Sequence, residues 1–294
     1  MVALVNFNAS HNALTSVESN CFNQATSLEI VDFSYNNINT TIENVRFVVN
    51  NQLKYLNFYN NHVTGIQENS FMQCRIYYIN FENNNITGDI KENTFTGLRN
   101  VTKLDLSRQR VSGIKNKAFT DMVSLTHLNL SFNIISEIEN ASFYNSSLIM
   151  LDLSHNQVSD LNFFQNCLSN LTELYVNDNN IDVIPKNSFA SQSLGIIGKN
   201  VFSPPYNFKG VDNMYSLDLS YNNLTQLTFN KSIWTNNLKA LYLNNNKLTD
   251  ISKLFVNICR LVYLDISNNY ISNITTLNHV PNAKCGCTVQ VICT

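Results

Sequence analysis

Three polar side chains are placed so that they could act together on a substrate or a metal ion. Asp105, His127 and Asp152 each lie in or beside a short L-x-L segment, and an imidazole near two carboxylates can serve acid–base chemistry or metal binding. Aspartate also recurs at this place within an L/V-D-L/F/I-S sequence, at Asp32, Asp218 and Asp265. That recurrence favours the alternative, a solvent-facing strand position.

No other motif for catalysis occurs in the chain. A nucleophile elbow, a P-loop, a dinucleotide-binding fingerprint and a His-Glu-x-x-His motif are all absent from the sequence. We therefore predict that the chain is not an enzyme and uses no cofactor or metal. With 19 basic and 21 acidic residues, it has no cationic surface for nucleic acid. No apolar run reaches the ~18 residues of a membrane span.

One repeat positions these side chains. The frame L-x-x-L-x-L-x-x-N-x-L recurs along almost the whole chain. Its twelve first apolar positions are Leu4, Leu28, Leu53, Ile76, Val101, Leu125, Leu148, Leu171, Leu194, Met214, Leu238 and Leu261. The x-L-x-L-x core predicts a short strand with alternate side chains inward. Stacked turns then predict a solenoid with one parallel sheet on its concave face.

Asparagine fills the ninth position of the frame in ten of the twelve repeats. These residues are Asn12, Asn36, Asn61, Asn84, Asn133, Asn156, Asn179, Asn222, Asn246 and Asn269. An inward amide can bond backbone groups of its own and the adjacent turn, so we expect a hydrogen-bonded ladder. Gln109 should do this less well, and Phe202 cannot. Asn37, Asn180 and Asn245, in the surrounding turns, are expected to tolerate left-handed geometry.

A phenylalanine spine has the same period as the ladder. It comprises Phe22, Phe47, Phe71, Phe95, Phe119 and Phe143. Together, frame and spine resemble the typical extracellular leucine-rich repeat over about residues 4–280, as in Toll-like receptor ectodomains and secreted insect leucine-rich immune proteins. The resemblance implies a horseshoe solenoid with a concave parallel sheet. Its convex side would hold loops, extended segments and short 3₁₀ segments.

The regularity fails in two places. Within an irregular repeat at residues 190–213, Leu194 and Ile197 keep the strand frame but Lys199 takes an inward position. This segment is either a decayed repeat with a loop or a loop that contacts a partner. Residues 1–280 are assigned to the solenoid and residues 281–294 to a partial Cys-containing cap. Because exposed solenoid ends need caps, the N-terminal end is expected to continue upstream or to be covered by a partner.

The seven cysteines fall into two groups. Cys21, Cys74 and Cys167 stand singly and are expected to be small buried side chains. Cys285 lies about one period after the repeat that contains Cys259, so we hypothesise a Cys259–Cys285 or Cys259–Cys287 disulfide, with Cys293 pairing the remaining thiol. A zinc site is the alternative, but a fourth ligand is not evident.

The repeat class and the terminal cysteines favour an extracellular or cell-surface setting, although the N-terminus does not resemble a signal peptide. Eleven Asn-x-Ser/Thr sequons add weak support. They are Asn8, Asn39, Asn85, Asn100, Asn129, Asn140, Asn145, Asn170, Asn223, Asn230 and Asn273. A glycan at Asn129 would stand on the middle of the concave sheet and direct binding towards its ends.

Tyrosines are concentrated on the predicted concave face. The candidate partner-binding residues are Tyr35, Tyr55, Tyr59, Tyr77, Tyr78, Tyr215, Tyr242 and Tyr263. Exposed tyrosines suit partner contact; the alternative is cross-strand stacking without a ligand. We predict an extracellular binding protein or receptor segment for a protein or glycan ligand, acting alone or as a homo- or heterodimer. Innate immunity is what the resemblance implies. A structural adhesion or matrix protein and a cytosolic adaptor are the alternatives.

Overall fold

The computed structural model consists of two compact units, residues Met1–Leu148 and Ile149–Thr294. It describes residues 3–18, 21–22, 24–43, 52–72, 75–163, 168, 170–182, 215–227, 238–251, 261–272 and 290–292. The hypothesised disulfide cysteines, the sequons at Asn230 and Asn273 and the irregular segment 190–213 lie outside these residues.

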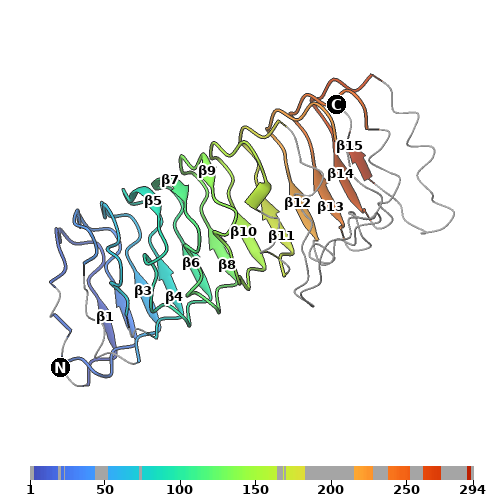
Figure 1. Ribbon diagram of the computed structural model, residues 1–294. Coiled ribbons are helices and arrows are strands. Elements are labelled where there is room, and N and C mark those ends of the chain that lie inside the picture. The colour runs from blue at the N-terminus through green and yellow to red at the C-terminus, as the bar shows by residue number, and fades with distance from the viewer. Residues whose placement is uncertain are drawn as a thin grey trace, which may run out of the picture. The chain divides into compact units, whose positions relative to one another are not determined.

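Six short strands of the first unit form a parallel sheet, in the order in which they occur along the chain (Figure 1). They are β1 (Asn6–Asn8), β2 (Ile30–Asp32), β3 (Tyr55–Asn57), β4 (Tyr78–Asn80), β6 (Lys103–Asp105) and β8 (His127–Asn129). The middle residue of each strand from β2 onwards is a fully buried Val, Leu or Ile. The alternation of the repeat thus places the apolar side chain inside and its two neighbours outside.

A second, smaller sheet runs along another side of the same turns. It comprises β5 (Thr87–Ile90), β7 (Arg110–Ile114) and β9 (Glu137–Ile138), which pair in parallel. These segments follow the ladder positions of three consecutive repeats, where extended structure was predicted. Lys115 follows β7 directly and forms ion pairs with both neighbouring strands. Its Nζ lies 3.4 Å from Asp89 Oδ2 on β5 and 2.8 Å from Glu137 Oε2 on β9.

The second unit repeats the arrangement of the first. Its sheet contains β10 (Met150–Asp152), β11 (Glu173–Tyr175), β12 (Ser216–Asp218), β13 (Ala240–Tyr242), β14 (Tyr263–Asp265) and β15 (Gln290–Ile292), paired in parallel in that order. A short 3₁₀ stretch occupies residues 162–163. The parallel sheet of stacked turns in each unit confirms the predicted fold. Strand β15 was not predicted, because its residues were assigned to a cap.

The sheet of the second unit continues without interruption from β11 to β12. Strand β11 pairs directly with β12, with Tyr175 opposite Asp218. The amide oxygen of Asn222 accepts the N–H of Ile181 at 3.0 Å. Asn179 and Asn222 are therefore consecutive members of the ladder, although they lie 43 positions apart in the sequence. Leu194 and Ile197, which are expected to keep the strand frame, lie outside the described residues.

Most ladder asparagines bond two turns each. Asn84, for example, donates from Nδ2 to the carbonyl oxygens of Phe58 in the preceding turn and Phe81 in its own, both at 2.8 Å. Its Oδ1 accepts the N–H of Val63 at 2.9 Å. The ladder residues from Asn36 to Asn246 are buried, whereas Asn12, in the first turn, is exposed. Each buried amide thus satisfies backbone groups that would otherwise lack partners.

Gln109 joins the ladder with one bond fewer. Its Oε1 accepts the N–H of Ile86 at 3.1 Å, and its Nε2 donates to the carbonyl oxygens of Phe81 and Ser107 at 2.6 and 2.9 Å. The bond that asparagine makes to the carbonyl three residues earlier is missing at Gln109. The extra methylene moves the amide past that acceptor, while the rest of the pattern is kept.

Phenylalanines form two stacked columns inside the first unit. Phe119 lies between two other spine residues, with ring centroids 5.6 Å from both Phe95 and Phe143. A second column that the sequence analysis did not single out joins Phe58 to Phe33 and Phe81, at 5.3 and 5.4 Å. Cys21, by contrast, is an exposed free thiol, so the prediction that it is a buried side chain is wrong. It lies near the N-terminal end of the unit, where neighbouring turns cover less surface.

A left-handed residue precedes each described ladder position. The φ angles of these residues lie between 52° and 56°, and they are His11, Tyr35, Asn60, Asn83, Arg108, Phe132, His155, Asp178, Tyr221, Asn245 and Asn268. Asn245 therefore has the expected geometry. The prediction is wrong for Asn37 and Asn180, which follow the ladder residue and have no positive φ. The chain must reverse before the amide can turn inward, so the strained residue comes first.

The left-handed geometry leads to a prediction at Tyr221, which has a φ of 52° and is 53% exposed. Tyr221→Asn should raise the free energy of unfolding by up to about 1 kcal/mol, since asparagine tolerates this region, whereas Tyr221→Val should lower it. Urea denaturation followed by circular dichroism measures both changes. A valine variant at least as stable as the asparagine variant would contradict the assigned geometry.

Candidate partner-binding surfaces

The outward face of each sheet is formed by the first and third residues of its strands. These residues are half-buried in most strands, whereas the middle residue is buried. A parallel pair sets equivalent residues of consecutive repeats side by side about 4.8 Å apart. Tyr55 lies opposite Tyr78 in this way, and Asn57 lies opposite Asn80. Side chains from distant parts of the sequence therefore meet on this face.

Most Asp and Asn residues at the third strand position have a structural role. Asp105 accepts the backbone N–H of Ser107 at 2.8 Å and its hydroxyl at 2.6 Å through Oδ1. Asp218 accepts the N–H of Ser220 at 2.9 Å in the same manner. Such Asx turns lead the chain out of the strand. The recurring L/V-D-L/F/I-S sequence thus reflects turn formation.

Within the first unit, Asp105 and His127 occupy different rows of the outward face. His127 lies opposite Lys103, while Asp105 lies opposite Asn129 and accepts its Nδ2 at 3.1 Å. The His127 Nδ1 is 2.9 Å from the hydroxyl of Thr126. Asp152 belongs to the other unit. Within the described part of the chain, no three His, Cys, Asp or Glu side chains are grouped to hold a metal ion.

Tyrosines of the first unit come together in two pairs. The rings of Tyr55 and Tyr78 stack with centroids 4.9 Å apart and planes 12° apart. Tyr35 meets Tyr59 edge-on at 5.1 Å and stacks on His11 at 4.2 Å. These four tyrosines, which we call the first-unit tyrosine cluster, lie on strands β3 and β4 or in the turns that follow β2 and β3.

Tyr77 also lies at this part of the face and is 50% exposed. It precedes strand β4 and has no ring partner among the described residues. Two tyrosine hydroxyls of the face, those of Tyr55 and Tyr78, are harder to ionise than a free phenol. Burial raises the pKa of Tyr78, and the nearby Tyr55 and Asp105 raise it further. These phenols therefore present neutral hydrogen-bonding groups to a partner.

In the second unit, three predicted tyrosines line the sheet. Tyr242 and Tyr263 approach with ring centroids 4.9 Å apart, inclined at 43°. Lys239 Nζ lies over the ring of Tyr215, 5.1 Å from its centroid. Such a cation–π contact is attractive because the ring face is negative.

Tyr175 belongs to the same face but was missed by sequence reasoning. Its hydroxyl donates to Glu173 Oε2 at 3.1 Å, and burial together with this bond raises the pKa of Tyr175 to about 12. It occupies the third strand position of β11, where most repeats have Asp or Asn. The repeat frame alone could have identified it, since Tyr242 holds the same position in β13.

The sequons are placed unequally. Asn39, Asn140, Asn145 and Asn170 are exposed. Asn129 is half-buried, with its Oδ1 accepting the N–H of Ser131 at 3.0 Å. A glycan on Asn129 would disturb its contact with Asp105.

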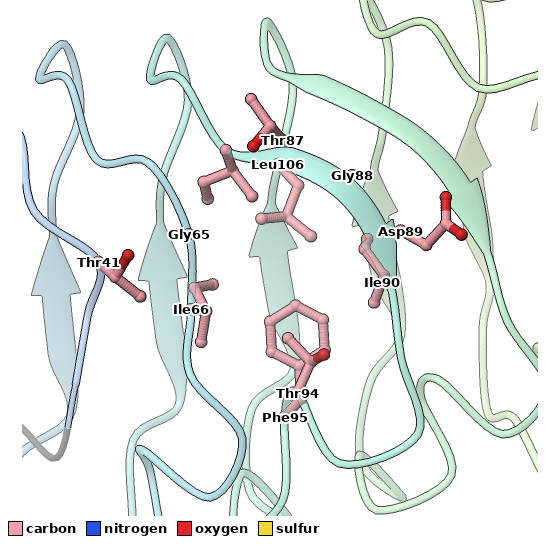
Figure 2. Close-up of a pocket in the computed structure, with 11 residues that line it drawn as sticks. Thr41, Gly65, Ile66, Thr87, Gly88, Asp89, Ile90, Thr94, Phe95 and Leu106 are labelled. Carbon is pink, nitrogen blue, oxygen red and sulfur yellow. The ribbon is translucent and has the colours of Figure 1, made fainter.

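One small cavity lies in the first unit beside the second sheet (Figure 2). It encloses about 130 Å³, and its lining includes Ile66, Ile86, Ile90, Phe95 and Leu106. Figure 2 shows the Asp89 carboxylate turned towards β7, where it accepts the hydroxyl of Ser112 at 2.8 Å. Typical ligand pockets hold about 300–1,000 Å³, so this cavity does not indicate a small-molecule site.

Family models match most of the chain. "BspA type Leucine rich repeat region (6 copies)" matches residues 2–89, and "Leucine rich repeat" matches residues 74–135 and 99–158. "Leucine Rich repeats (2 copies)" matches residues 146–186 and 236–279. In the described part of the chain, no helix has the length and hydropathy to span a membrane.

Comparison with individual proteins gives partial matches. Osteomodulin of Rattus norvegicus is 33% identical over 142 residues, which are 45% of this chain and 33% of osteomodulin. The chain therefore spans about a third of that relative. A leucine-rich repeat protein of Bacteroides eggerthii has a TM-score of 0.75 at 19% identity, covering 99% of this chain and 49% of that one.

The structure titled as the Toll–Spatzle complex of Drosophila has a TM-score of 0.71 at 23% identity, covering 88% of this chain and 32% of that one. Both structural likenesses establish the fold alone, since fold does not specify function. The common period, the asparagine ladder and the matched ranges agree on one assignment. The chain belongs to the leucine-rich repeat family.

Proposed function

We propose that this chain is a non-enzymatic recognition module that binds a protein partner outside the cell, on the outward faces of its parallel sheets. The observation that carries the proposal is the first-unit tyrosine cluster, in which four half-exposed or exposed rings from two strands and two turns form two contacting pairs. Tyrosine offers large contact area, few rotatable bonds and a polar tip. A partner could therefore bury these rings without a large loss of side-chain entropy.

Similarity to a solved receptor complex supports a more specific form of this proposal. The Toll–Spatzle complex is a molecular hub in Drosophila development and innate immunity. By analogy we propose cell-surface or innate-immune recognition for this chain as well. The resemblance of its repeats to the extracellular type and its exposed sequons favour a secreted or cell-surface location. An adhesion or matrix protein and a cytosolic adaptor remain the competing functions.

Replacing Tyr55 and Tyr78 together with alanine should weaken partner binding at least tenfold, because centrally placed tyrosines contribute about 2 kcal/mol or more each at protein interfaces. The probe is a displayed library of secreted proteins and cell-surface ectodomains, screened with the wild-type chain. Each binder is then titrated against the variant by surface plasmon resonance. Circular dichroism verifies that the variant is folded, as expected for side chains outside the core.

Tyr144→Ala is the matched control, because Tyr144 is 50% exposed and lies outside the strands of the sheet. It should leave affinity unchanged. An equal loss for Tyr144→Ala and for the double variant would contradict the proposed site. A screen without any ectodomain binder would contradict the extracellular function itself.

A further inference from the structure

The third strand positions of the second unit alternate between two residue types. Asp152 lies opposite Tyr175, Tyr175 opposite Asp218, Asp218 opposite Tyr242 and Tyr242 opposite Asp265. We call these five residues the Asp–Tyr row. The equivalent positions of the first unit contain only Asp and Asn: Asn8, Asp32, Asn57, Asn80, Asp105 and Asn129. The alternation is thus specific to one sheet.

The surroundings of the Asp–Tyr row add negative charge. Glu173 lies on β11 and accepts the Tyr175 hydroxyl, and Asp178 follows the same strand, 3.6 Å from His155 Nε2. Lys239 is the nearby lysine, and it is engaged with the ring of Tyr215. Within the described residues, the carboxylates of this face therefore outnumber its permanent cations.

Asp218 and Tyr242 of the row are harder to ionise than usual. Burial raises the pKa of Asp218, and the charges of Asp178 and Asp152 raise it further. Burial also raises the pKa of Tyr242, with added contributions from Tyr263, Asp218 and Asp265. All these shifts have the direction expected where negative charges lack a compensating cation.

We infer that the Asp–Tyr row binds an extended cationic segment of a protein partner, with Arg or Lys at about every third residue. Neighbouring carboxylates of the row are two strands apart, about 9.6 Å. A polyproline II segment advances about 3.1 Å per residue, so three residues cover about 9.3 Å and return to the same side. The inference rests on the proposed function, since it specifies the partner chemistry of one binding face.

The two residue types of the row would share the contact. Each Asp uses Oδ1 for its Asx turn, with Asp152, Asp218 and Asp265 accepting the N–H two residues later at 2.9–3.0 Å. A carboxylate has about four acceptor sites, so capacity remains for a cation. The tyrosine rings between them accept aliphatic stems and cation–π contacts. Lys239 over Tyr215 demonstrates such a contact at the edge of this face.

The test uses the whole chain and a synthetic probe, a ten-residue Pro-rich peptide with Arg at every third position. Fluorescence anisotropy should show saturable binding that weakens as NaCl is raised. The double variant Asp218→Asn and Asp265→Asn should weaken it at least tenfold. Asparagine keeps the Oδ1 acceptor of the turn, as Asn57, Asn80 and Asn129 do in their own repeats, so the variant should remain folded.

Two controls complete the design. Asp105→Asn makes the same change at the same strand position of the other unit and should leave peptide affinity unchanged. A peptide of identical composition with contiguous arginines should bind at least threefold more weakly. Absence of saturable binding, equal loss with Asp105→Asn, or equal affinity for the contiguous peptide would overturn the inference. None of these three peptide results bears on the proposed function. That function is tested separately, by the loss of ectodomain binding when Tyr55 and Tyr78 are replaced with alanine.

Discussion

Replacing Asn133 with alanine should lower the free energy of unfolding by about 3–5 kcal/mol. The Nδ2 of Asn133 donates to the carbonyl oxygens of Leu106, Leu130 and Ser131 at 2.9, 3.0 and 3.2 Å. Its Oδ1 accepts the N–H of Val111 at 3.0 Å. The residue is only 7% exposed, so water cannot readily replace these bonds. Each buried group left without a partner costs about 1–3 kcal/mol.

Two variants give graded controls for this prediction. Asn133→Gln should cost less than Asn133→Ala, because Gln109 keeps three ladder bonds in its own repeat. Asn12→Ala should cost about 1 kcal/mol, since Asn12 is exposed and bonds only Ala9 and Ser10 of its own turn. Urea denaturation followed by circular dichroism provides the free energies. A loss of stability for Asn133→Ala no larger than that for Asn12→Ala would contradict the structural role assigned to the buried ladder amides.

Replacing Phe119 with alanine is expected to cost about 3–5 kcal/mol, the usual range for a buried Phe in a close-packed core. The ring is 4% exposed and lies between Phe95 and Phe143, with interplanar angles of 14° and 3°. Its removal would open a cavity between two turns and separate the stacked neighbours. Because each repeat contacts mainly its neighbours, amide exchange should accelerate most in the turns beside Phe119.

Phe132→Ala provides the matched comparison, since Phe132 is 41% exposed and contacts Arg108 through a cation–π pair at 4.4 Å. Its cost should stay below about 1 kcal/mol. Thermal and urea unfolding of both variants measure the two losses of stability. Comparable losses for Phe119→Ala and Phe132→Ala would show that the spine does not carry the core packing assigned to it.

Much of each turn follows from the sequence. The strand positions, their buried middle residues and the inward asparagines all depend on interactions within one turn or between equivalent positions of successive turns. A fixed period repeats these interactions, so one frame predicts them along the chain. The outward placement of Tyr55 and Tyr78 follows from the same alternation.

Other features depend on contacts that the frame does not encode. The left-handed residue precedes the ladder asparagine because the backbone must reverse before the amide turns inward. The column of Phe33, Phe58 and Phe81 forms because one position is aromatic in three consecutive turns. In neither case does the amino-acid type alone indicate the geometry, since Tyr, Arg and Phe occupy left-handed positions that Gly or Asn would favour.

The Asp–Tyr row shows most clearly what the tertiary structure decided. By the sequence frame, Gly198 would stand between Tyr175 and Asp218 and interrupt the alternation. In the structure β11 pairs directly with β12, and the two residues lie opposite each other. The frame predicts which side chains point outward, but neighbours on a parallel sheet are set by backbone pairing between turns. Backbone hydrogen bonds between β11 and β12 therefore decide which side chains meet on this face, and the order of repeats along the chain does not.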